Sequence, residues 1–222
     1  MKNSILIKNG RIINEGKIYR SDIYIEDEII KEISPSISPK LSDTITIDAE
    51  NNYVIPGLID DQVHFREPGL THKGDIYTES RAAVAGGITS FLEMPNTIPQ
   101  TITQDKLKEK FTIASKKSIA NYSFMFGGTN DNINEILELD FKEVPALKIF
   151  LGSSTGNMLL DNLDALEEIF LKCNLPIAVH CEDENTIREN LKLYTDIYGE
   201  NIPIKFHSKI RNEEACYLSS SM

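Results

Sequence analysis

Residues 60–69 hold the densest group of side chains that could do chemistry. Because side chains along a strand alternate between its two faces, Gln62, His64 and Arg66 are predicted to share one face of an emerging strand. A histidine there can ligate a divalent metal, and an arginine two residues on can hold a carboxylate with two hydrogen bonds. On spacing alone, a solvated strand end with a charged rim explains the segment slightly better than a ligand site does.

Two further segments interrupt or end apolar runs with a residue that could do chemistry. Residues 176–180 end in His180, and a single strand-end histidine is more often structural than a ligand. Cys181 is expected on the opposite face from His180. Lys148 lies inside an apolar run, where an ammonium group is unfavourable unless it is paired or chemically modified. We therefore give Lys148 more weight than either histidine.

From residue 56 onward the sequence predicts strands that alternate with helices. Continuous apolar runs predict five buried strands, at residues 57–65, 89–94, 122–126, 146–151 and 176–180. Amphipathic stretches predict helices at 76–85, 103–118, 132–139, 163–172, 185–198 and 211–220. Asp161 is the predicted N-cap of the helix at 163–172. Repeated strand-then-helix units with buried strands indicate a parallel sheet, open or closed.

Polar residues follow several of these strands at their carboxyl ends. His64 and Arg66 follow the first strand, Asn96 the second and His180 the fifth. In a (β/α) barrel, and also in an open parallel sheet, ligands bind at this edge. The glycines at 86–87 precede a strand rather than follow one, so a dinucleotide-binding fingerprint is absent and nucleotide binding is rejected.

Residues 1–55 have a different pattern, and we expect a small β-sandwich-like domain there, followed by a second domain at 56–222. Short runs alternate polar and apolar residues, at 4–8, 11–14, 22–26, 28–33 and 44–48. Turn pairs between them, at 9–10, 15–16 and 27–28, predict antiparallel strands joined by tight turns, and the Ser/Pro stretch 34–39 predicts a loop. The first domain is small enough that we expect it to pack on the second.

Composition excludes several classes of partner. The chain has 222 residues and a formal net charge of −11, which argues against nucleic-acid and anionic-membrane partners. No window approaches the roughly 20 apolar residues that span a bilayer, and the N-terminus lacks the apolar region of a signal peptide. Three widely spaced cysteines, Cys173, Cys181 and Cys216, indicate free thiols rather than disulfides. We expect a cytoplasmic protein.

Together, these segments resemble the dihydroorotase family of the amidohydrolase superfamily over residues 54–215. Four pieces carry the resemblance in order: 56–60 with 64–69 for the first strand, 85–89 with 94–97 for the second, 148–153 for the fourth and 180–183 for the fifth. A leading β-domain is also typical of the family. Agreement in this order is far more specific than any single piece.

The resemblance implies an α/β fold, a partial TIM-type (β/α) barrel of about five units. It implies metal-dependent, reversible hydrolysis of the cyclic amide of dihydroorotate to N-carbamoyl-L-aspartate in pyrimidine biosynthesis. His64, Lys148 and His180 would hold one or two zinc ions, with Lys148 carbamylated, and Arg66 and Asn96 would bind the substrate carboxylate. The implied partners are the small-molecule substrate, further copies of the chain in a homo-oligomer, and another enzyme of the pathway.

Two departures from the family pattern bear on activity. The family has His-x-His in its first strand, whereas Gln62 stands first here, and an amide oxygen is a poor zinc ligand. The alternatives are a single metal, a second metal held weakly through Gln62, or lost catalysis, and we expect fewer than two metals per chain. A complete barrel takes about 250 residues, so the family's later histidine and its catalytic aspartate are expected beyond Met222. His207 is predicted to lie in a loop, and the 222-residue chain is expected to be inactive alone.

Three other functions stay open. Hydantoinase and allantoinase share the metal site and the strand-four lysine, but Arg66, as a carboxylate clamp, favours dihydroorotase. A non-catalytic scaffold for another pathway enzyme is the third. Gln62 and the missing half favour a scaffold, whereas retention of Lys148, His180 and Arg66 argues against it.

Overall fold

The computed structural model describes residues 4–152 and 158–222, and the chain divides into two compact units, Met1–Gly57 and Leu58–Met222. Ser153, which closes the fourth-strand segment of the family resemblance, lies outside the described residues. Of the helices in the described parts, none is long and apolar enough to cross a membrane.

The first unit is built on a five-stranded sheet. β1 (Ser4–Asn14) pairs with β2 (Lys17–Glu26), and β2 pairs with β3 (Ile29–Ser34), all antiparallel as predicted. β4 (Ile45–Asp48) and β5 (Tyr53–Val54) pair with β1 in parallel, so the expectation of antiparallel strands throughout was wrong. The chain between β3 and β4 returns to the start of β1, where Ile5 pairs with Ile45, and therefore re-enters the sheet in the direction of β1.

The turn predicted at Asn9-Gly10 was also wrong, because β1 runs through it. The register with β2 shifts between Ile7 and Gly10, and Asn9 has a left-handed φ of 58°, which together make a β-bulge. The Asn9 backbone N–H donates to Asp22 Oδ1 at 2.9 Å and stabilises the bulge. The turn predicted at residues 15–16 is confirmed: both residues have positive φ, as a two-residue hairpin turn requires.

The second unit contains parallel strands in sequence order. One sheet has the order β6 (Leu58–Val63), β7 (Ile88–Glu93), β8 (Asn121–Phe124), and the other has β9 (Phe126–Gly127), β10 (Leu147–Phe150), β11 (Ile177–His180). All neighbours are parallel. Only Met125 separates β8 from β9, so the two form one interrupted strand. Five strands in sequential order, with helices between them, form a partial (β/α) barrel, and the predicted fold class is confirmed.

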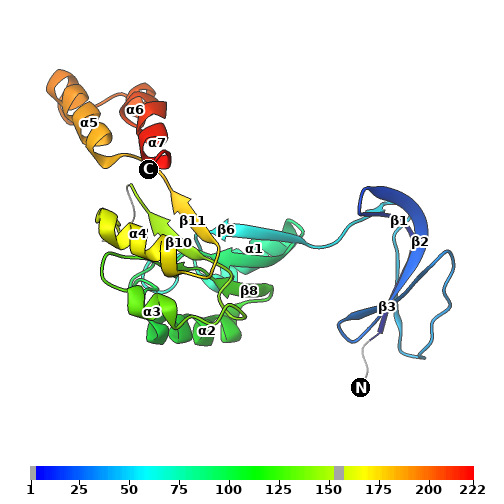
Figure 1. Ribbon diagram of the computed structural model, residues 1–222. Coiled ribbons are helices and arrows are strands. Elements are labelled where there is room, and N and C mark those ends of the chain that lie inside the picture. Colours follow the sequence, from blue (N-terminus) through cyan, green and yellow to red (C-terminus); the bar gives the residue numbers. More distant parts are fainter. Residues whose placement is uncertain (1–3, 153–157) are drawn as a thin grey trace. The chain divides into compact units, whose positions relative to one another are not determined.

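Helices follow these strands close to where the sequence predicted them. They are α1 (Ile76–Ala85), α2 (Gln104–Lys117), α3 (Ile133–Leu137), α4 (Leu163–Lys172), α5 (Glu184–Tyr198), the 3₁₀ turn η1 (Ile204–Phe206), α6 (His207–Ile210) and α7 (Glu213–Ser220). Two details were wrong. His207 begins α6 instead of lying in a loop, and Asn162 caps α4 because its Oδ1 accepts from the backbone N–H groups of Asp164 and Ala165. Asp161 instead accepts a hydrogen bond from Asn130 Nδ2 at 2.9 Å. Helices α5, α6 and α7 gather beyond the end of β11 (Figure 1).

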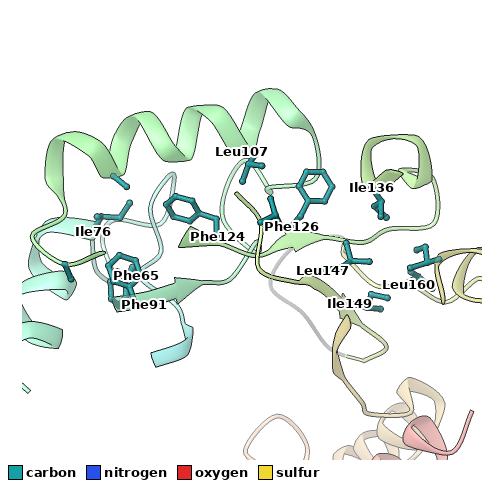
Figure 2. Close-up of a cluster of buried hydrophobic side chains, with 14 residues drawn as sticks. Phe65, Ile76, Phe91, Leu107, Phe124, Phe126, Ile136, Leu147, Ile149 and Leu160 are labelled. Atoms are coloured by element: carbon teal, nitrogen blue, oxygen red, sulfur yellow. The ribbon is translucent and has the colours of Figure 1, made fainter. Parts of the chain in front are cut away.

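Two apolar clusters lie on opposite faces of the strands. The larger packs between strands and helices: Phe91 lies beside Phe65, Phe126 lies beside Leu107 of α2, and Leu147 and Ile149 lie farther along (Figure 2). A smaller cluster contains Met94, Met125 and Ala146. Because alternate residues of a strand face opposite ways, Lys148 and Phe150 lie on the face of β10 that points away from the helices.

Candidate active site

The ends of β6 and β7 are joined through His64 and Asn96. His64 Nδ1 lies 2.9 Å from Asn96 Oδ1, and Asn96 itself is buried. Because an amide oxygen can only accept, the imidazole donates from Nδ1 and keeps Nε2 unprotonated when it is neutral. Burial, more than the charges of Arg66 and Lys148, lowers the pKa of His64. Burial and these two positive charges therefore favour the neutral imidazole, which is the form that binds metals.

Backbone contacts hold the two loops that carry these residues. The N–H of Met94 donates to Val63 O at 3.0 Å, and the N–H of Ile98 donates to Pro68 O at 3.1 Å. Gly69 has a φ of 83°, and a Cβ there would lie 1.9 Å from Ile98 O. Only glycine fits this approach, and the loop after β6 is therefore fixed against the loop after β7.

Arg66 has donor capacity left over. Its backbone is left-handed, with a φ of 69°, and its Nη1 is buried without a hydrogen-bond partner among the residues described. A guanidinium with a free buried N–H can bind an anion that enters the site. The alternation that placed it on the face of Gln62 ends with β6 at Val63, and the Gln62 residue is exposed.

Lys148 is the most unusual residue of the site. It is 3% exposed, and its Nζ lies 5.1 Å from the centre of the Phe150 ring. Across residues 4–152 and 158–222, no carboxylate forms an ion pair with it. Burial lowers the pKa of Lys148, which favours a neutral, nucleophilic amine.

His180 lies on the same face of the sheet as Lys148. Phe150 is opposite His180 in the parallel pairing of β10 with β11, and the centres of their rings are 6.2 Å apart. His180 Nε2 lies 2.8 Å from Glu182 Oε2, and Glu182 also pairs with Arg211. This hydrogen bond with Arg211 is the main reason that the pKa of Glu182 is lowered.

His64, Lys148 and His180 therefore each keep one nitrogen without a hydrogen-bond partner in the described parts of the chain. Two imidazoles and a lysine that can become a carbamate fit a zinc site in donor type. They do not complete one, because the described residues contain no cluster of three or more His, Cys, Asp or Glu side chains that could hold a metal. Gln62 makes no side-chain hydrogen bond within the same residues.

Sequence reasoning missed four charged residues near the site. Glu182 and Arg211 are described above, and Glu93 of β7 forms a buried ion pair with Lys110 of α2. A carboxylate within the apolar run of β7 and a lysine on the apolar side of α2 were the available signals. Glu182 directly follows the His-Cys pair, but nothing local points to Arg211, which is 29 residues away.

These features define an α/β protein with a polar site at the carboxyl ends of parallel barrel strands. The amidohydrolase family model matches residues 53–197, and the chain belongs to this family. Members of the family are generally metal-dependent.

Curated relatives and solved structures agree with this assignment. The chain is 37% identical over 193 residues to a dihydroorotase of Methanosphaera stadtmanae, covering 86% of this chain and 42% of that protein. It is 54% identical over 97 residues to a dihydroorotase of Carboxydothermus hydrogenoformans, covering 43% of this chain and 22% of that protein. An L-hydantoinase (dihydropyrimidinase) from Arthrobacter aurescens superposes on the whole chain with a TM-score of 0.90 and 27% identity, covering 49% of that enzyme. The chain spans less than half the length of these curated relatives.

Proposed function

We propose that this chain carries part of the active site of a dihydroorotase, which hydrolyses the cyclic amide of dihydroorotate reversibly to N-carbamoyl-L-aspartate. One observation carries the proposal: Lys148 is buried on the site face of β10 without a carboxylate partner in the described residues. A lysine in that state is stable if carbon dioxide adds to its neutral amine with loss of a proton, because the resulting carbamate is an anion that binds metal. The dihydroorotase relatives at 37% identity support the same reaction.

We propose His64 Nε2, His180 Nδ1 and carbamylated Lys148 as zinc ligands, with Gln62 at most a weak one and fewer than two metals per chain. When bound, the metal would lower the pKa of a water molecule and polarise the ring carbonyl. Arg66 would bind the substrate carboxylate through its free N–H groups. Asn96 would fix the tautomer of His64 and add a polar contact to the substrate.

We also propose that the chain assembles with further copies of itself, that another enzyme of the pathway is a partner, and that the protein is cytoplasmic. All three cysteines are free thiols, which supports a reducing compartment.

A hydantoinase activity is the second candidate, because the L-hydantoinase superposes on the whole chain. The two functions differ in one substrate group: dihydroorotate carries a carboxylate on its ring, and dihydrouracil does not. Arg66 favours the substrate that carries the carboxylate.

Equilibrium binding to the zinc-loaded chain separates these functions. We expect L-dihydroorotate to bind at least about tenfold more tightly than dihydrouracil, because one charge-assisted hydrogen bond contributes about 1.5–3 kcal/mol. Arg66→Ala should abolish the difference, whereas Arg81→Ala, on the exposed side of α1, should not change it. Equal binding of both ligands would favour hydantoinase, and binding of neither by the folded chain would favour a scaffold. The chain alone should show no turnover, so measurable hydrolysis by the purified chain would contradict this expectation.

A further inference from the structure

Glu182 links His180 to a residue from a distant part of the chain. His180 Nε2 lies 2.8 Å from Glu182 Oε2, and Arg211 Nε donates to Glu182 Oε1 at 2.9 Å. Arg211 Nη2 also contacts Oε2, so the guanidinium holds both carboxylate oxygens. The side chain of Glu182 is 16% exposed and that of Arg211 is 29% exposed. This two-point arrangement is the strongest geometry for an arginine–carboxylate pair.

The backbone holds both ends of this link in place. At the strand end, the N–H of Leu151 donates to His180 O at 2.9 Å, and a Cβ on Gly152 would lie 2.5 Å from Glu182 O. Glu182 therefore sits directly against the end of the neighbouring strand. The backbone from which its side chain reaches His180 is therefore fixed by this close approach.

On the other side, Arg211 is the C-cap of α6 and is held from α5. Asn190 Nδ2 of α5 donates to Ile210 O at 3.2 Å, next to Arg211. The N–H of Asp183 donates to Ala215 O at 2.8 Å, so the segment that carries Arg211 is joined to the end of β11. Arg211 thus reaches Glu182 from a fixed segment rather than from a free loop.

The chemistry of this link determines which nitrogen of His180 is protonated. An ionised carboxylate can only accept hydrogen bonds, so His180 must donate from Nε2, and its lone pair is then on Nδ1. The second partner acts on the position of the carboxylate: Arg211 binds both oxygens of Glu182 and so holds Oε2 toward His180.

We propose that Glu182, held by Arg211, is a positioning residue that fixes His180 as the Nε2-protonated tautomer and reserves Nδ1 for the metal. The statement that Nδ1 binds the metal rests on the proposed function, whereas the statement that Nε2 carries the proton does not. Carboxylates that hold a ligating histidine in this way commonly contribute 10–100-fold to metal affinity.

Nitrogen NMR of the chain labelled with ¹⁵N-histidine tests the proposal directly. Two-bond ¹H–¹⁵N spectra distinguish the two neutral tautomers, and His180→Asn identifies the resonances of His180 among the four histidines. We expect a proton on Nε2 in the wild-type chain, and zinc should shift Nδ1 while Nε2 keeps its proton. Glu182→Ala should give a mixture of tautomers and weaken zinc binding 10–100-fold. Glu168→Gln, which removes an exposed carboxylate from α4, should change neither measurement.

Three results would overturn the proposal: a proton on Nδ1 in the wild-type chain, a zinc shift on Nε2 or none at His180, or an unchanged tautomer in Glu182→Ala. If Glu182→Ala does not fold, Glu182→Met decides, because it keeps most of the side-chain volume and leaves no oxygen to accept the Nε2 proton of His180. It should give the same mixture of tautomers. Failure of the dihydroorotate proposal would leave the tautomer unchanged, since no substrate takes part in this experiment.

Discussion

The ion pair between Glu93 and Lys110 allows a quantitative test of the packing beneath the site. Both side chains are 1% exposed, and Lys110 Nζ also donates to Met94 O at 2.8 Å. Removing one member of such a pair leaves the other buried charge without its ion-pair partner, which costs about 3–5 kcal/mol. Lys110→Met and Glu93→Gln keep most of the side-chain volume, so the loss in each is mainly electrostatic.

A change in protonation of the remaining residue sets an upper limit on the loss in free energy of unfolding of each variant at pH 7. In Lys110→Met, Glu93 can take up a proton, which costs about 4 kcal/mol from its ordinary pKa of about 4.3. In Glu93→Gln, Lys110 can lose its proton, which costs about 5 kcal/mol from its ordinary pKa of about 10.4. Burial raises the pKa of Glu93 and lowers that of Lys110, in agreement with both responses.

The two variants should therefore have opposite pH dependences. Folded Lys110→Met binds more protons than its unfolded chain, so its free energy of unfolding falls as pH rises. The difference from the wild-type chain therefore becomes smaller below pH 7. Folded Glu93→Gln binds fewer protons than its unfolded chain, so its stability rises with pH and its deficit shrinks toward pH 10. Each slope should approach about 1.4 kcal/mol per pH unit, the value for one proton.

Urea unfolding of the two single variants and the double variant, at pH 5.5, 7 and 9, measures these quantities. The double variant should lose about 3 kcal/mol less than the sum of the single losses, because neither charge is then left alone. Lys106→Met and Glu109→Gln, which remove an exposed pair from the same helix, should each cost less than about 1 kcal/mol. Additive losses, or the same pH slope in both single variants, would refute the reasoning.

Three further changes have predictable effects on stability. Gly69→Ala places a Cβ 1.9 Å from Ile98 O at a φ of 83°, and should lower the free energy of unfolding by about 2–4 kcal/mol in urea titration. Asn162→Ala removes the N-cap of α4, and should cost about 1 kcal/mol in the same assay. Glu182 has a lowered pKa because of Arg211, so its contribution is present above the ordinary carboxyl range and is lost as pH falls below about 4. Acid titration of Glu182→Gln should therefore show less loss of stability in that range than the wild-type chain.

Controls for these changes come from the same chain. Gly16→Ala has a positive φ but meets nothing within 4 Å, so it should cost less than Gly69→Ala. Asn162→Asp keeps a capping oxygen and should be nearly neutral. Glu168→Gln should leave the acid titration unchanged. Equal losses for the two glycine variants would show that the contact with Ile98 is not what requires glycine at position 69.

Local signals predicted the helices well and the N-terminal sheet only in part. Helices α1 and α4 begin and end at the predicted residues, because periodicity and nearby boundary signals are local properties. The pair Asn9-Gly10 is an equally local turn signal, yet pairing with β2 on both sides turns it into a bulge. Alternation marks a strand but not its direction, so it could not predict that β4 is parallel to β1.

At the candidate site, too, local signals predicted some contacts, whereas contacts that depend on the packing of distant elements could not be predicted. Parallel strands end at one edge, so the sequence could predict that His64 and Asn96 would be neighbours, as the 2.9 Å hydrogen bond confirms. It could not predict Arg211, because that residue reaches Glu182 only after α5 and α6 have formed. Contacts between residues far apart in sequence depend on the packing of whole elements, and no pattern in the sequence encodes them.

The two buried lysines of the second unit support the proposed chemistry through their contrast. Lys110 and Lys148 are 1% and 3% exposed, so both amines have lost most of their contact with water. Lys110 has Glu93 and a carbonyl oxygen as partners, which is the ordinary way to stabilise a buried ammonium. Lys148 has neither among the described residues, and it lies on the face of the sheet that carries His180. This contrast supports the proposal that Lys148 is carbamylated, because a carbamate would supply both a negative charge and ligand atoms.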